Sequence, residues 1–96
     1  MTTQSSQNGQ WTQRLAELGI ELPQVAAPVA AYVPAVQTGN QVWTSGQLPY
    51  IDGVLPHTGK VGAEVTEEQA YECARIALLN ALAAVDALVG LDEVAR

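Results

Sequence analysis

The chain has 96 residues, a formal net charge of −6 and a single cysteine. This length is enough for one domain with a modest core, and oligomerisation is a common way for so short a chain to bury more surface. With only four cations against ten carboxylates, the composition argues against a nucleic-acid-binding surface, which needs clustered Lys and Arg.

The sequence also carries signals about compartment. Cys73 has no partner for a disulfide within the chain, which fits a reducing environment. The first ten residues lack the cationic and apolar regions of a signal peptide. The longest apolar run, Ala81 to Val89, is interrupted by Asp86 and is too short to span a bilayer. We therefore expect a cytoplasmic protein that does not enter a membrane.

The N-terminal third predicts a tail, a short helix and a connector. Residues 1–9 are polar and rich in Ser and Gln, and we expect them to be disordered. Trp11, Leu15 and Leu18 follow at helical spacing, and Gly19 is a typical residue just past a helix end. The proline-rich stretch that follows, residues 23–34, predicts an extended connector.

The next segment predicts a β-hairpin. Val33–Val36 forms one arm, Thr38–Asn40 the turn, and Gln41–Ser45 the second arm. Because Pro34 has no N–H to donate, the first arm should lie at a sheet edge or start pairing late. Residues 48–62 contain turn-forming Pro and Gly and predict a loop with at most a short strand.

The clearest element is a long second helix. Thr66 and Gln69 have the spacing of a capping box, and Gly90 should end the helix after Val89. The polar stripe is narrow and consists of Glu68, Glu72, Arg75 and Asp86. The apolar side chains that we expect to be covered by a sheet and by another subunit are Ala74, Leu78, Ala81, Leu82, Val85 and Leu88. Two or three short strands cannot cover so wide a face, so the chain has the pattern of the first part of a domain.

Several common motifs are absent. The stretch from Gly53 to Lys60 looks like a phosphate loop, but five residues separate its glycines and Val61 replaces the magnesium-binding Ser or Thr. His57 and Cys73 are the only His and Cys, so no zinc site of ordinary spacing is present. A lone loop histidine is usually solvated, and a mid-helix cysteine is more often a small buried hydrophobe than a reactive thiol.

A polar group at the end of the hairpin has two interpretations. The second arm stops at Thr44-Ser45-Gly46-Gln47, and antiparallel pairing brings Tyr32 to the same end of the sheet. In the first interpretation Ser45 satisfies a backbone group at a strand end and Tyr32 is an aromatic strand residue. In the second, these side chains line a small ligand pocket.

The stretches "YVPAVQTGNQVWTSGQLP" and "GKVGAEVTEEQAYECARIALLNALAAVDALVGLDEVAR" resemble the RidA/YjgF family, which is also labelled endoribonuclease L-PSP. The resemblance runs from Arg14 to Arg96. It implies one α+β domain over residues 10–96, of the chorismate-mutase-like type, with a mixed sheet backed by two helices. Against that pattern the domain looks truncated at its C-terminus. Family members form homotrimers with a cleft at each subunit interface.

The resemblance also implies a chemistry. Family enzymes hydrolyse reactive 2-imino and enamine acids to 2-keto acids and ammonia, without a metal or cofactor. The residues that match the family pocket are Tyr32, Ser45 and Gly46, so the expected partners are an imino or keto acid and other copies of the chain. The family's carboxylate-binding Arg and water-positioning Glu have no match here, so we expect weak or no catalysis by this chain.

Two classes of function therefore stay open, a deaminase and a noncatalytic module. The module would bind a small carboxylate or a partner protein through the same cleft. A ribonuclease or translation-inhibitor role has less support, because the chain is acidic.

Overall fold

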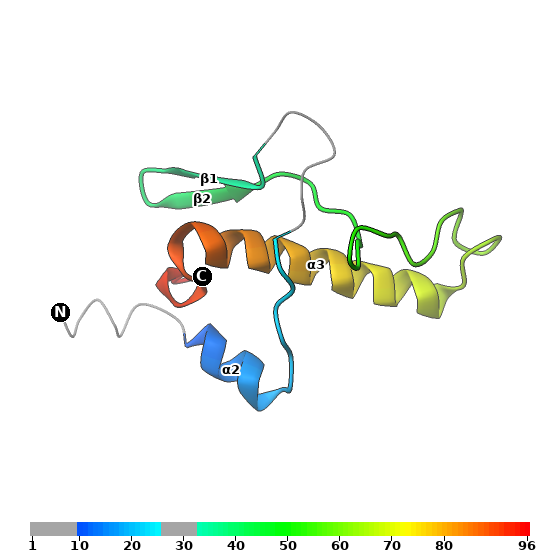
Figure 1. The fold of residues 1–96 in the computed structure, drawn as a ribbon, viewed down its shortest axis with the longest axis horizontal. Helices are drawn as coiled ribbons and strands as arrows, with labels where there is room; N and C mark the ends of the chain where they lie inside the picture. The colour runs from blue at the N-terminus through cyan, green and yellow to red at the C-terminus, as the bar shows by residue number, and fades with distance from the viewer. Residues whose placement is uncertain (1–9, 26–32) are drawn as a thin grey trace.

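The computed structural model describes residues 10–25 and 33–96. Figure 1 shows a hairpin along one side of a long helix, with a short helix on the other side. In chain order the elements are α2 (Trp11–Glu17), β1 (Ala35–Thr38), β2 (Gln41–Thr44), α3 (Glu67–Val89) and the 3₁₀ turn η1 (Leu91–Glu93). The α+β class is confirmed, and the described part of the sheet is one antiparallel pair. The predicted tail, residues 1–9, lies outside the described residues.

The long helix α3 begins and ends where the sequence predicts. The Thr66 hydroxyl accepts from the Gln69 backbone N–H at 3.1 Å, and the Gln69 side chain accepts from the Thr66 N–H at 2.9 Å. This reciprocal capping box satisfies two N–H groups that the helix itself cannot pair. Gly90 follows the last helical residue with φ of 85°, a conformation that favours glycine. Within the described ranges, neither α3 nor any other helix is long and apolar enough to cross a membrane.

The hairpin is present, but the predicted boundaries of its first arm and turn are wrong. The first strand is β1, Ala35–Thr38, and Thr38 pairs with Gln41 instead of lying in the turn. The turn is therefore the two residues Gly39 and Asn40. Gly39 has φ of 60°, as the first central residue of a type II′ turn requires, and this turn matches the twist of the paired strands.

The packed face of α3 overlaps the predicted one in part, since Ala81, Leu82 and Val85 are half-buried. Its buried side chains are Asn80, Ala83 and Ala84, whereas Leu78 and Leu88 of the predicted core face are 58% and 43% exposed. The hairpin lies along the C-terminal half of α3 (Figure 1). The side chains that the chain itself buries on α3 are therefore small or polar, and part of the predicted apolar face is exposed.

The short helix α2 is held by η1 at the other end of the chain. Gln10, at the N-cap position, makes no side-chain cap. The carboxylate of Asp92 accepts instead from the Thr12 backbone N–H at 2.9 Å and from the Thr12 hydroxyl. The Trp11 indole N–H donates to the Val94 carbonyl at 2.7 Å. Because isolated helices of this length are marginal in water, these contacts determine whether α2 forms.

The link between α2 and η1 should depend on pH. The Thr12 hydroxyl and the Thr12 backbone N–H hold the pKa of Asp92 below its ordinary value. The carboxylate therefore stabilises docking above the ordinary aspartate pKa of about 3.9 and loses this effect as the pH falls through the lower folded value. We expect hydrogen exchange at the Trp11 indole N–H to accelerate in that acidic window.

The substitution Asp92→Ala should give fast exchange at the Trp11 indole already at neutral pH. Glu72→Ala, which removes an exposed carboxylate from α3, is the matched control and should leave the exchange rate unchanged. Equal indole exchange in Asp92→Ala and the unmodified chain would show that α2 is held by other contacts.

Candidate functional site

The polar group at the end of β2 is centred on Ser45, which is half-buried. The Ser45 backbone N–H donates to the Pro34 carbonyl at 2.9 Å and continues the hairpin pairing by one residue. The Ser45 hydroxyl lies 3.3 Å from the same carbonyl, and the Gln47 side-chain amide donates to Ser45 Oγ, also at 3.3 Å. The hydroxyl thus satisfies a strand-end group, as the first interpretation predicts.

Those two hydroxyl contacts are long. Hydrogen bonds between oxygens are usually about 2.7–2.8 Å, and N–H···O bonds about 2.9–3.0 Å. Since a serine hydroxyl rotates freely and has two lone pairs, it can turn toward another acceptor at little cost. The geometry therefore fits the strand-end interpretation and also leaves Ser45 free to contact a ligand.

Gly46 is the residue of this strand-end group that has open space beside it. A Cβ built at Gly46 would meet nothing within 4 Å, and its φ is not positive. Neither backbone conformation nor packing within the described chain therefore requires glycine there. The space beside Gly46 can accommodate a ligand or another subunit.

The third predicted site residue cannot be placed. Tyr32 lies outside the described residues, two positions before Pro34, so its predicted proximity to Ser45 stays a prediction. The chain's four cations are Arg14, Lys60, Arg75 and Arg96, and all are exposed. Across residues 10–25 and 33–96, no hydrogen bond or ion pair joins any of them to Ser45, Gly46 or Gln47, and Arg14 pairs with Glu17 at 3.2 Å.

The sequence reasoning missed Asn80. This side chain is 2% exposed and is bonded to the segment that directly follows Gln47. The available signal was an amide in the middle of an otherwise apolar helix face. The apolar pattern of α3 favours its leucines as core residues and gives no indication of an amide bonded to a distant loop.

The loop that looks like a phosphate loop is occupied by the chain itself. The carboxylate of Glu64 accepts from the Lys60 backbone N–H at 2.9 Å, and this bond holds the pKa of Glu64 below its ordinary value. No helix starts at this loop, since α3 begins at Glu67. An anion would have to displace the Glu64 side chain, which agrees with the rejection of a nucleotide site.

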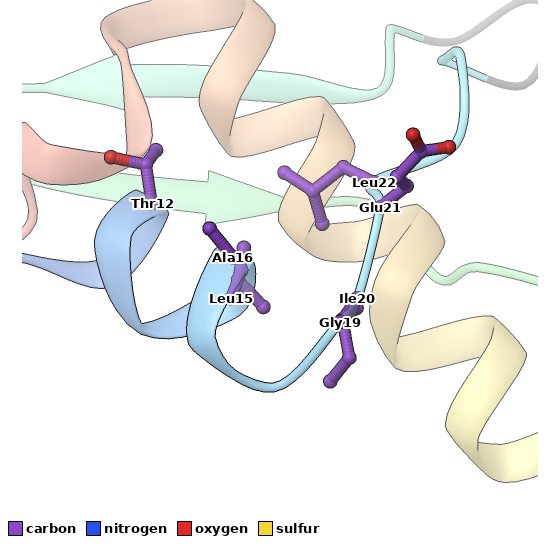
Figure 2. A pocket seen from close by; sticks show the side chains of 7 residues that line it. All are labelled: Thr12, Leu15, Ala16, Gly19, Ile20, Glu21 and Leu22. Carbon is purple, nitrogen blue, oxygen red and sulfur yellow. The ribbon is translucent and has the colours of Figure 1, made fainter.

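A separate hollow of about 710 Å³ lies beside α2 and the connector after it, and Figure 2 shows the side chains that line it. Most of them are apolar, and the hydroxyl of Thr12 is already bonded to Asp92. This hollow has no group suited to binding a carboxylate. The described residues also contain no cluster of three or more His, Cys, Asp or Glu that could hold a metal ion.

The fold is that of a known family. The family described as "YjgF/chorismate mutase-like, putative endoribonuclease" matches residues 12–96. The chain belongs to this family, as the resemblance indicated.

Individual relatives agree with this assignment. The chain is 39% identical to "Protein TCP17" of Trypanosoma cruzi over 90 residues, covering 93% of the chain and 56% of that protein. It is 37% identical to "Putative reactive intermediate deaminase TdcF" of Escherichia coli K12 over 66 residues, covering 69% of the chain and 44% of that protein. The chain spans about half the length of these relatives.

Solved structures show the same fold. A "putative endoribonuclease" from Shewanella oneidensis MR-1 superposes with a TM-score of 0.77 at 41% identity, over 84% of this chain and 54% of that one. The protein Atu1372 "with unknown function" from Agrobacterium tumefaciens gives a TM-score of 0.68 at 40% identity, over 83% of this chain and 48% of that one. The two structures carry different functional descriptions. The likeness to them therefore establishes the family and the fold but no common activity.

Two glycine substitutions should behave in opposite ways. Gly46→Ala should keep the free energy of unfolding within about 0.5 kcal/mol of the unmodified chain, because its Cβ meets open space. Gly59→Ala should destabilise by about 1–3 kcal/mol, because Gly59 has φ of 125° and its Cβ would lie 2.5 Å from Glu64 Cβ. Urea unfolding of both variants measures the difference. A Gly46→Ala variant as unstable as Gly59→Ala would mean that this position is required by the fold.

Proposed function

We propose that the end of β2 forms one wall of a site for a small 2-imino or 2-oxo acid, and that the chain takes part in RidA-like imine hydrolysis. The observation that carries the proposal is the half-buried Ser45 hydroxyl with two long hydrogen bonds beside the open backbone of Gly46. The likeness to a protein named as a reactive intermediate deaminase supports this reaction.

The reaction adds water to the C=N carbon of a 2-imino acid and then breaks the C–N bond, so that a 2-keto acid and ammonia leave. The carboxylate of the substrate must be bound and the water must be positioned. Ser45 Oγ can donate one hydrogen bond to the carboxylate, and the Gly46 region provides room for its approach. Each of these steps makes or breaks a polar bond or transfers a proton.

The described residues do not supply positive charge to this wall. Burying a carboxylate in a partly dry cleft without a cation costs several kcal/mol of binding free energy. Hydrogen bonds from neutral hydroxyls do not offset this cost as an Arg does. We therefore propose that efficient turnover needs a cation from outside the Ser45–Gln47 group, and that this chain alone binds the acid weakly.

The open face of the hairpin provides a second surface for the site. Val36 pairs directly with Trp43, and the two side chains are 46% and 60% exposed, whereas Ala35 and Val42 on the opposite face are half-buried. We propose that further copies of the chain cover this face in a homotrimer, which would place the β2 end at a subunit boundary. The packing of copies in a crystal tests this arrangement.

Binding of 2-oxobutanoate, a stable 2-keto acid, tests the proposed site. In ¹⁵N spectra of the chain, titration should shift the amide signals of Ser45, Gly46 and Gln47. Ser45→Ala should weaken binding by about three- to tenfold, the effect of one hydrogen bond worth roughly 0.5–1.5 kcal/mol. Thr38→Ala, exposed and at the turn end of the hairpin, is the matched control and should bind as the unmodified chain does.

Ammonia release from 2-iminobutanoate generated in situ then separates the two classes of function. We expect a rate near the uncatalysed one for this chain alone. Strong turnover that Ser45→Ala abolishes would mean that one of the four cations completes the site. Amide shifts confined to other parts of the chain, or no shifts at all, would contradict the proposed site.

A further inference from the structure

Asn80 is a buried polar residue that the proposed chemistry does not use. Its side chain lies in the middle of α3 and is 2% exposed, the lowest value among the described residues that are buried. Burying an amide is unfavourable unless its polar atoms are bonded. An apolar residue would fill the same place at lower cost, so the bonds that Asn80 makes need a reason.

The amide nitrogen of Asn80 bonds two carbonyls of a distant segment. Nδ2 donates to the Leu48 carbonyl at 2.9 Å and to the Tyr50 carbonyl at 3.2 Å, so both N–H groups of the amide have acceptors. These acceptors lie 32 and 30 positions earlier in the chain. The contact therefore fixes the loop after β2 to the middle of α3.

The segment held by Asn80 is a tight turn. The Tyr50 N–H donates to the Leu48 carbonyl at 2.8 Å, which closes a three-residue γ-turn around Pro49. Proline restricts φ to about −65°, close to the value that the inverse γ-turn requires. The Leu48 carbonyl thus accepts from both Tyr50 and Asn80, and the turn and its anchor share one oxygen.

This anchor is adjacent to the candidate site. On one side Ser45 is fixed by its backbone bond to Pro34, and on the other Leu48 is fixed by Asn80. Only Gly46 and Gln47 lie between these two fixed points. If the turn at Pro49 shifts, the backbone of Gly46 and the Gln47 side chain that donates to Ser45 Oγ must shift with it.

We propose that Asn80 is a positioning residue for the site: by holding the Leu48 and Tyr50 carbonyls, it sets the path of Gly46 and Gln47 beside Ser45. The identity of the ligand, a small 2-oxo or 2-imino acid, rests on the proposed function. The effect of Asn80 on the backbone of Gly46 and Gln47 is independent of that proposal.

The test uses Asn80→Asp in the 96-residue chain. Aspartate is nearly the same size, but its carboxylate has no N–H and faces two carbonyl oxygens, so both bonds are lost. We expect the amide signals of Gly46 and Gln47 to move in the absence of ligand. At a temperature where the variant is fully folded, its affinity for 2-oxobutanoate should fall at least tenfold. Asn80→Ser, which removes the amide without adding charge, replaces this variant if it does not fold.

Ala84→Gly is the matched control. Ala84 is 3% exposed on the same helix, and glycine there lowers the melting temperature without touching the Leu48 or Tyr50 carbonyl. It should leave the Gly46 and Gln47 signals and the affinity within twofold of the unmodified chain. If both variants weaken binding equally, Asn80 contributes only to stability and the inference is wrong.

The outcomes also separate this inference from the proposed function. If the unmodified chain does not bind 2-oxobutanoate, the proposed function fails, and the ligand-free spectra alone decide on Asn80. Unmoved Gly46 and Gln47 signals in the Asn80 variant would then overturn the positioning role, and moved signals would support it.

Discussion

The packing of the hairpin along α3 determines where the other described elements can lie. A two-stranded hairpin is marginal in water, so β1 and β2 need this helix to persist. The helix is fixed at its start by the Thr66 capping box and ends at Gly90, where η1 turns the chain. The loop that follows β2 is held at the middle of this helix by the Asn80 bonds to the Leu48 and Tyr50 carbonyls.

Several large apolar side chains are exposed in the described part of this chain. Tyr71 and Leu78 on α3 are 79% and 58% exposed, and Trp43 on the hairpin is 60% exposed. Trp43 and its strand neighbour Val36 form the exposed apolar pair that the proposed subunit contact would cover. The chain spans about half the length of its relatives.

The sequence predicted the elements with strong local signals. The capping box, Gly90 and the short helix ending near Gly19 depend on neighbouring residues, and the structure confirms them. Local signals did not determine the hairpin ends, because pairing of Thr38 with Gln41 depends on the turn that forms between them. They also favoured the leucines of α3 as the core, whereas the fully buried side chains of α3 are Asn80, Ala83 and Ala84. For the proposed site, Ser45 was selected from its position at a strand end and Gly46 from the family resemblance, and their role in binding stays a prediction. Asn80 was missed because its role depends on carbonyls some 30 positions away.

A crystal structure of the chain with 2-oxobutanoate tests the central claim most directly, that the end of β2 is one wall of a carboxylate site. We expect the ligand carboxylate within hydrogen-bonding distance of Ser45 Oγ, beside the Gly46 backbone, and a second copy of the chain packed on the face formed by Val36 and Trp43. We also expect the Asn80 bonds to Leu48 and Tyr50 to be intact in the complex. A ligand bound in the hollow beside α2, with the Ser45 group in contact only with the chain itself, would show that the end of β2 is not the site.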